Sequence, residues 1–236
     1  MRRRTRNLPE LFNPDSPGVM EVYRVLATIA GKGRNGVKSV LITSAMPREG
    51  KSILAAYLGM TAAHSGRKTL MIDLDLRRSI LHRLFKTIRT PGLGDMLASE
   101  EPIHPNELIY PTQMENLFLL PSGSRLSSPS GILRIRIDRV KKLIAELSVA
   151  YDILIIDSPP IVPVNDAELI APFVDGVVLV VMGGKTFREI VARAVELIRK
   201  ANGNLIGMVL NNVTRALPYY YEHKYYRYSY EAKKDD

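Results

Sequence analysis

The sequence of 236 residues contains no cysteine, no tryptophan and no long apolar run. Without cysteine there is no disulfide and no thiolate metal site, and the composition is compatible with a reducing cytoplasm. The longest apolar run, GVVLVVM at 176–182, has the length of a buried strand and falls short of the ~20 residues that cross a bilayer. No apolar core follows the opening MRRRTRNLPE, so we expect no signal peptide.

Acidic residues are outnumbered by basic ones. The chain has 33 basic and 24 acidic side chains and a net charge of +9, which indicates an anionic partner such as a nucleotide or a membrane surface. Arginines dominate the opening MRRRTR. Such an arm could contact acidic lipid head groups or a nucleic acid, or it could simply be a solubilising, disordered end.

We divide the chain into a basic disordered arm (1–15), a folded domain (16–213) and a tyrosine-rich flexible tail (214–236). Length and a hydrophobic content of 46% allow one large domain with a proper core. Predicted strands lie at 38–44, 68–73, 117–123, 152–157, 176–182 and 205–211. Predicted helices lie at 17–30, 50–65, 132–149, 165–172 and 186–201, the last with capping-box spacing between Thr186 and Glu189.

The predicted strands are nearly all continuous apolar runs, which is typical of strands buried on both faces. Because helical segments separate them, we predict an α/β fold in which a mainly parallel, twisted sheet carries helices on both faces. Ligands of such sheets bind beyond the carboxyl ends of the strands. The chemistry is therefore expected at those ends.

The first predicted strand runs into SAMPREGKSILAAYL, which we interpret as a phosphate-binding loop, residues 45–52, that opens a helix. Backbone N–H groups and a helix amino terminus favour bound phosphate. Lys51 is expected to reach the β- and γ-phosphates of ATP, and the Ser52 hydroxyl to ligate Mg²⁺. Ala45 departs from the usual pattern, which begins with glycine. The expected nucleotide contacts are Pro47, Arg48, Glu49, Gly50, Lys51, Ser52 and Ile53.

Aspartates end two further strands. Asp73 and Asp75 lie in MIDLDLRR, and on an extended chain they would point the same way and repel each other unless a cation lay between them. The Mg²⁺ of a nucleotide would meet that need; the structural alternative is that the pair caps the next helix. Asp157 ends DILIID, a usual position for a carboxylate that holds a magnesium-bound water. The expected metal set is Ser52, Asp73 and Asp157.

These motifs resemble those of the bacterial tyrosine autokinases of exopolysaccharide and capsule synthesis, the BY-kinases. The resemblance covers roughly residues 16–212 and the tail, and it rests on VLITSAMPREGKS, TLMIDLDLRRSILHRLF and YDILIIDSPPIVPVNDAELIAPFVDGVVLVV. It implies a P-loop NTPase fold related to division-site and plasmid-partition ATPases, and ATP:protein-tyrosine phosphotransferase activity. It also implies Lys51, Asp73 and Asp75 as catalytic residues and Asn211 near the adenine.

Seven of the 11 tyrosines fall in the tail, and the resemblance implies that they accept phosphate. A phenol has a pKa near ~10 and must lose its proton as it attacks, so it needs a nearby carboxylate; we expect Asp73 to orient or deprotonate it. Alternatively, the tail is an aromatic segment that packs on a partner or stacks on RNA. The acceptors expected from the resemblance are Tyr219, Tyr220, Tyr221, Tyr225, Tyr226, Tyr228 and Tyr230.

The resemblance implies protein partners and a place in the cell. They are a membrane-embedded polysaccharide co-polymerase that activates the kinase, a neighbouring subunit's tail and a cognate phosphotyrosine phosphatase; no nucleic acid is expected. Because the sequence has no transmembrane part, we expect the separate-subunit form, cytoplasmic and held at the inner face of the membrane by its partner.

Two positions depart from the family pattern. Ala27 replaces the second arginine of the Glu-x-x-Arg-x-x-Arg motif that Glu21 and Arg24 begin, which weakens the case for a homo-oligomeric ring because a bidentate partner for carboxylates is lost. Arg48 stands where a small residue is more common. It could add positive charge near the phosphates or merely face water.

Two other functions compete with a kinase. A partition-type ATPase would carry a signature lysine just after the first loop position, where this chain has Met46. A nucleotide-responsive scaffold, or a basic nucleic-acid binder whose affinity falls steeply with salt, would give no reason for the acidic pairs.

Overall fold

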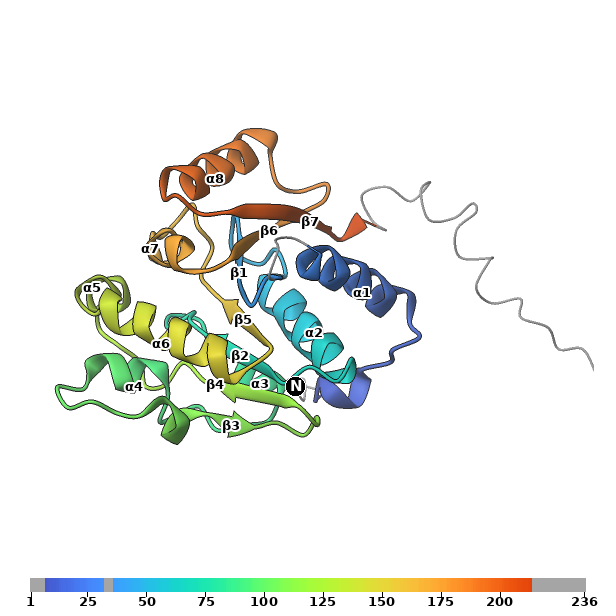
Figure 1. The fold of residues 1–236 in the computed structure, drawn as a ribbon. Helices are drawn as coiled ribbons and strands as arrows, with labels where there is room; N and C mark the ends of the chain where they lie inside the picture. Colours follow the sequence, from blue (N-terminus) through green and yellow to red (C-terminus); the bar gives the residue numbers. More distant parts are fainter. Residues whose placement is uncertain (1–6, 32–35, 214–236) are drawn as a thin grey trace, which may run out of the picture.

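Residues 7–31 and 36–213 are described by the computed structural model, and they form a seven-stranded sheet flanked by helices (Figure 1). The strands are β1 Ser39–Ser44, β2 Thr69–Asp73, β3 Tyr110–Pro111, β4 Leu117–Leu120, β5 Ile153–Asp157, β6 Gly176–Met182 and β7 Leu205–Asn211. Their order is β3-β4-β2-β5-β1-β6-β7, and every neighbouring pair is parallel except β3 with β4. The predicted α/β class and mainly parallel sheet are confirmed.

Helices cover both faces of this sheet (Figure 1). They are α1 Pro17–Ala30, α2 Lys51–His64, α3 Leu81–Leu84, α4 Leu93–Ala98, α5 Pro129–Ile135, α6 Ile137–Ala150, α7 Asp166–Ile170 and α8 Arg188–Lys200, with 3-10 turns η1 Pro9–Leu11, η2 Pro105–Leu108 and η3 Ala171–Phe173. The first three α-helices pack on one face of the sheet, and α4 to α8 contribute to the core on the other.

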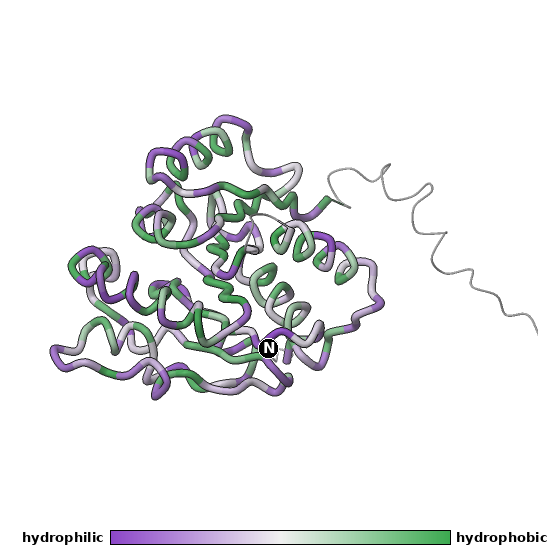
Figure 2. The backbone as a smooth tube through the Cα atoms, viewed as in Figure 1, coloured by the Kyte–Doolittle hydropathy of each residue, from purple (hydrophilic) through white to green (hydrophobic). Residues whose placement is uncertain are grey.

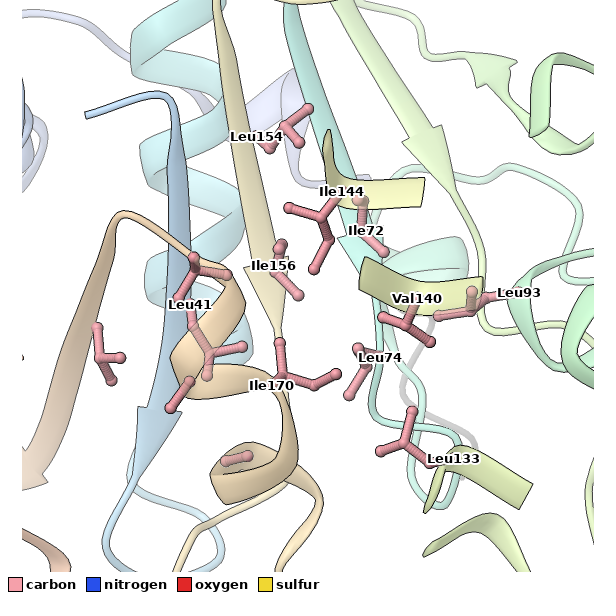
Figure 3. Packing of buried hydrophobic residues seen from close by; sticks show 14 of the residues in the cluster. Leu41, Ile72, Leu74, Leu93, Leu133, Val140, Ile144, Leu154, Ile156 and Ile170 are labelled. Atoms are coloured by element: carbon pink, nitrogen blue, oxygen red, sulfur yellow. The ribbon is translucent and has the colours of Figure 1, made fainter. Parts of the chain in front are cut away.

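Successive residues of the central strands supply the two cores in turn. Leu41 and Ile156 lie in the core under α6 and α7, together with Val140 and Ile170 (Figure 3). Their strand neighbours, such as Ile42, belong to the core under α1 and α2. Each such side chain contributes roughly 1.5–3 kcal/mol when it is fully buried. The hydropathy colouring shows the same pattern, with apolar strands inside and polar stretches outside (Figure 2). Burial on both faces is the physical reason why the central strands read as continuous apolar runs. The same expectation is wrong for β7, an edge strand whose Met208 and Leu210 are exposed.

The structure corrects several local expectations. The helix predicted at 132–149 is two helices, α5 and α6, separated at Arg136. The capping box predicted at Thr186 is wrong: Phe187 is the N-cap residue of α8, and the Thr186 hydroxyl donates instead to the Glu49 carboxylate. The short elements α3, α4 and β3 were not expected from the sequence.

Residues 7–15, which the sequence suggested would be disordered, pack against the domain. The Leu8 N–H donates to the Leu84 carbonyl over 3.0 Å, and the side chains of Asn7 and Leu8 are buried. Glu10 forms an ion pair with Lys86 at 3.2 Å. Leu8 packs with Leu81 and Leu84 of α3, and this burial orders the segment in spite of its polar composition. The basic residues 1–6 and the whole tyrosine cluster lie outside the described residues.

Candidate functional site

The phosphate-binding loop, residues 45–52, connects β1 to α2 in a conformation that requires glycine at Gly50. Gly50 has φ +95°, and an added Cβ would lie 2.1 Å from the Asn211 amide nitrogen. Arg48 also adopts a positive φ, +67°, which is uncommon for a residue with a side chain. Ala45 stands in the place of the usual first glycine. It is fully buried and its own φ is not positive, so this position does not require glycine for its backbone conformation. The loop opens a 14-residue helix, α2, whose first N–H groups have no partner within the helix.

Glu49, within the loop, and Asn211, at the end of β7, stabilise its conformation. The Met46 N–H donates to Glu49 Oε2 over 2.9 Å, and Thr186 donates to the other carboxylate oxygen. The Asn211 amide donates to the Glu49 carbonyl over 2.9 Å. The sequence predicted both residues as nucleotide contacts. The structure shows that the buried Glu49 side chain braces the loop, and that Asn211 connects the end of β7 to it.

Three aspartates and Lys51 converge at the carboxyl ends of β2 and β5. Asp73 and Asp157 are paired positions of these two adjacent strands. The Lys51 ammonium lies 2.8 Å from Asp75 Oδ2, 3.5 Å from Asp157 Oδ1 and 3.0 Å from the Ser52 hydroxyl. Residues predicted from three separate strand ends therefore do meet in one cluster.

Burial shifts the pKa values of the ionisable groups in this cluster, because it removes them from water. Burial, followed by the nearby Asp157 carboxylate, raises the pKa of Asp73 to about 8. Burial also raises the pKa of Asp157, to about 6, although Lys51 and Ser52 oppose the shift. Burial alone would lower the pKa of Lys51, but Asp157 and Asp75 outweigh it and the pKa is raised. Lys51 is therefore charged, and the cluster has more carboxyl groups than cations to balance them.

Two buried carboxyl oxygens, Asp73 Oδ1 and Asp157 Oδ2, have no hydrogen-bond partner among the described residues. Unpaired buried carboxyl oxygens indicate a missing cation or donor. Within the described residues no three His, Asp or Glu side chains form a ready-made metal site, but Mg²⁺ bound with a nucleotide needs only one or two protein carboxylates. The donor set therefore fits a magnesium ion that is completed by phosphate and water.

A cleft of about 690 Å³ adjoins the cluster. It lies between the phosphate-binding loop, the segment after β2 and the loop after β5, and among its lining residues are Pro47, Arg48, Gly50, Lys51, Ser52, Ile53, Asp75, Arg77, Arg78 and Pro159. Asp75 lies on the cleft wall, whereas Asp73 is fully buried behind it and does not line it. The reason is local: β2 ends at Asp73, so the strand alternation that would aim both carboxylates the same way stops there.

The structural alternative for the aspartates is also partly observed. Asp73 Oδ2 accepts from the Ser79 hydroxyl over 2.7 Å and from the Leu81 N–H, at the start of α3, over 3.4 Å. Asp75 Oδ1 accepts the Arg78 N–H over 2.9 Å. The two aspartates therefore shape the chain after β2 while they also face the cluster.

Sequence reasoning missed a polar network beside the cleft. Arg77 donates to Ser130 over 2.6 Å and lies 3.4 Å from the buried carboxylate of Asp166, to which Ser130 also donates. This network joins the segment after β2 to the starts of α5 and α7. The adjacent arginines Arg77 and Arg78 were the available signal, but the sequence does not show which of them Asp166 and Ser130 hold.

Comparisons with known proteins show the family to which the chain is related. Residues 48–190 match the family described as an AAA domain. The tyrosine-protein kinase YwqD of Bacillus subtilis is 35% identical over 99% of this chain and 94% of its own length. The putative tyrosine-protein kinase CapB of Staphylococcus aureus is 33% identical over 94% of this chain and 98% of its own length.

Solved structures show the same architecture. The kinase domain of the Escherichia coli tyrosine kinase ETK superposes with a TM-score of 0.81 at 27% identity, over 89% of this chain and 82% of that one. The chimerical protein CapA2B2 gives a TM-score of 0.78 at 32% identity, over 86% and 88% of the two chains. The septum site-determining protein MinD of Pyrococcus horikoshii, complexed with Mg-ADP, shares the fold with a TM-score of 0.64 at 24% identity, over 76% and 72%. Within residues 7–31 and 36–213, none of the helices combines the length and apolarity of a membrane span.

Proposed function

This chain belongs to the family of bacterial tyrosine-protein kinases, and from that premise we propose that its cleft transfers the terminal phosphoryl group of ATP to the tyrosines of its own tail or a neighbour's. The single observation that carries the proposal is the convergence of Lys51, Ser52, Asp75 and Asp157 beside one cleft. The relatives of similar length are named tyrosine-protein kinases, which favours a kinase. The likeness to MinD, at 24% identity, is one of fold alone and gives no support to a partition-type ATPase.

Binding of the nucleotide is assigned to the phosphate-binding loop and the start of α2. The loop N–H groups and the helix amino terminus hold the phosphates, and Lys51 exchanges its contact with Asp75 for the β- and γ-phosphate oxygens. Ser52, Asp73 and Asp157 would hold Mg²⁺, directly or through water, and the ion when bound neutralises charge on the phosphates. Pro47, Arg48 and Ile53 line the cleft at the same end.

The acceptor phenol is assigned to the Asp75 side of the cleft. Asp75 replaces Asp73 in the role expected from the sequence, because Asp75 lines the cleft and Asp73 does not. A bond forms between the phenol oxygen and the γ-phosphorus as the bond from that phosphorus to the β–γ bridging oxygen breaks, and ADP leaves with the bridging oxygen. The phenol proton passes to the Asp75 carboxylate. Positioning and charge neutralisation supply most of the catalysis in such transfers.

The tail is the proposed substrate. It begins a few residues beyond β7, whose last residue, Asn211, contacts the phosphate-binding loop. Each phosphate adds about 1.5 to 2 negative charges, so several would turn a near-neutral tail strongly acidic. This change would alter how the kinase binds its neighbours and a membrane-embedded activator, and we propose that it regulates polysaccharide synthesis and export. A phosphotyrosine phosphatase would reverse the change.

The test is autophosphorylation of the purified full chain with Mg-ATP, with and without the cytoplasmic segment of its membrane partner. Phosphotyrosine should appear in the parent and be mapped by mass spectrometry to 219–230. Lys51→Met should abolish it, whereas Lys142→Met, at an exposed position of α6 away from the cleft, should not.

Replacement of all seven tail tyrosines by phenylalanine separates the acceptor from the catalyst. We expect this variant to bind ATP as the parent does and to lose most of the label. Labelling as strong as that of the parent would show that the acceptors lie elsewhere in the chain.

A further inference from the structure

We propose that Arg78 and Arg48 form an anion site at the cleft that binds a phosphate on a tyrosine next to the acceptor, so that phosphorylation of one tail tyrosine favours the next. The inference rests on the proposed function, because it assigns a substrate preference to the same cleft. The ligand is an anionic side chain adjacent to the acceptor, with phosphotyrosine preferred over glutamate.

The cleft carries uncompensated positive charge. Its lining includes the cationic side chains of Arg48, Lys51, Arg77 and Arg78 and the single carboxylate of Asp75. Lys51 pairs with Asp75, and Arg77 is held by Ser130 and Asp166. Within the described part of the chain, the guanidinium groups of Arg48 and Arg78 form no ion pair, and both residues are exposed. Two arginines therefore remain for a ligand.

The backbone of Arg78 is held beside the position proposed for the acceptor. Its backbone N–H donates to Asp75 Oδ1 over 2.9 Å, and Asp75 is the carboxylate assigned to the phenol. Neighbouring residues of an extended peptide are about 3.3–3.6 Å apart along the chain. A group one residue from the acceptor consequently lies within reach of the long Arg78 side chain. The guanidinium fork matches a phosphate bidentately, which an ammonium group cannot do.

Arg48 supplies the second cation from the phosphate-binding loop. Its φ of +67° is one that most residues with a side chain avoid, and such strain tends to persist where function uses it. Arg48 is exposed and lines the same cleft as Arg78. The two arginines belong to different walls, since one follows β1 and the other follows β2.

The tail offers ligands of this chemistry. Its tyrosines occur in adjacent runs, Tyr219 to Tyr221 and Tyr225 to Tyr226, and Glu222 follows the first run directly. A phosphate carries about 1.5 to 2 negative charges against one for a carboxylate. The first transfer in a run would therefore create a better ligand for the next one.

The experiment compares peptides as substrates of the full chain whose seven tail tyrosines are phenylalanine, so that the tail does not compete. The peptides span residues 216–224 with Tyr220 as the acceptor and Phe at 219; position 221 is either phosphotyrosine or Phe. A second pair carries Glu222→Gln, which separates the phosphate from the carboxylate. We expect kcat/KM to be about 10-fold higher for the primed peptide, as a charge-assisted hydrogen bond implies.

The arginine variants identify the site. Arg78→Ala and Arg48→Ala should each lower the ratio of primed to unprimed kcat/KM, the double variant should bring it to about 1, and Arg78→Lys should leave it intermediate. Arg199→Ala, which removes the same charge from an exposed position of α8, should leave the ratio as in the parent. A ratio that Arg78→Ala leaves unchanged overturns the inference. Equal rates on the two peptides, including no turnover of either, also overturn it when the unaltered chain labels its own tail. A parent that labels no tyrosine at all overturns the proposed function instead.

Discussion

Asp73 and Asp157 occupy paired positions of the adjacent parallel strands β2 and β5, and both carboxyl groups are fully buried. Two like charges in such a place are unfavourable unless one is neutralised or a cation joins them. Lys51 lies beside Asp157, and Asp73 is the carboxyl group that stays protonated, since its pKa is the higher of the two. The buried carboxyl pair therefore lowers the unfolding free energy of the nucleotide-free protein.

Asp73→Asn should stabilise the nucleotide-free protein, and more so at high pH. The folded pKa of about 8 lies above the usual 3.8, so between these values the folded state keeps a proton that the unfolded state has released, and stability falls as pH rises. We expect a gain in unfolding free energy on the order of a few kcal/mol at pH 8 and about 1 kcal/mol at pH 5. Urea unfolding at the two pH values measures it.

The exposed Asp15 provides the control, because Asp15→Asn should change stability by a few tenths of a kcal/mol at most at either pH. A gain for Asp73→Asn that does not depend on pH would contradict the assignment of the raised pKa to this group.

The strand ends could be predicted from the sequence because each ends a continuous apolar run. Parallel strands buried on both faces bring their carboxyl ends to one edge, so Lys51, Asp73 and Asp157 had to lie near one another once the fold class was known. The same logic failed two residues beyond the strand, at Asp75. Asp75 faces the cleft because the chain leaves the sheet after Asp73, and strand periodicity says nothing about a segment that is no longer a strand.

Contacts between distant side chains away from these strand ends were not predictable. The Glu49 side chain is braced by Thr186, 137 positions away in the chain, and this contact removes Thr186 from the local capping box that its spacing suggested. The network of Arg77, Ser130 and Asp166 likewise joins three separate segments. Local patterns carry no information on which of several polar side chains a fold brings together.

Gly50→Ala should destabilise the phosphate-binding loop. Alanine at φ +95° would be strained by about 1–2 kcal/mol, and its Cβ would meet the Asn211 amide at 2.1 Å. We expect lower unfolding free energy and weaker binding of ADP, measured by chemical unfolding and calorimetry. The double variant with Asn211→Ala should recover part of the loss, because it removes the contact but not the strain.

Gly18→Ala is the matched control. Gly18 lies in α1, and an added Cβ would meet nothing within 4 Å. Alanine there should stabilise the helix by roughly 0.5–1 kcal/mol. Equal destabilisation by the two glycine substitutions would contradict the structure of the loop.

Glu49→Ala should weaken nucleotide binding without removing any group that touches phosphate. The substitution leaves the Met46 N–H and the Thr186 hydroxyl without their acceptor, which costs roughly 1–3 kcal/mol and releases the loop. Glu49→Gln keeps an acceptor and should be milder. The Kd for ADP, measured by calorimetry, should rise in the order parent, Gln, Ala; a rise for Gln as large as that for Ala would assign the effect to the charge.

Arg77 and Asp166 should be energetically coupled. Asp166 is 1% exposed, so Arg77→Met leaves a buried carboxylate with Ser130 as its remaining partner, and Asp166→Asn leaves Arg77 with a weaker acceptor. Each single variant should lose about 1–3 kcal/mol, and the double variant less than the sum, by about 0.5–3 kcal/mol. Because the network ties the segment that carries Asp75 to α5 and α7, the single variants should also lower kcat for tail phosphorylation. Additive losses of stability in a urea-unfolding cycle would show that the pair, although close, contributes nothing by its contact.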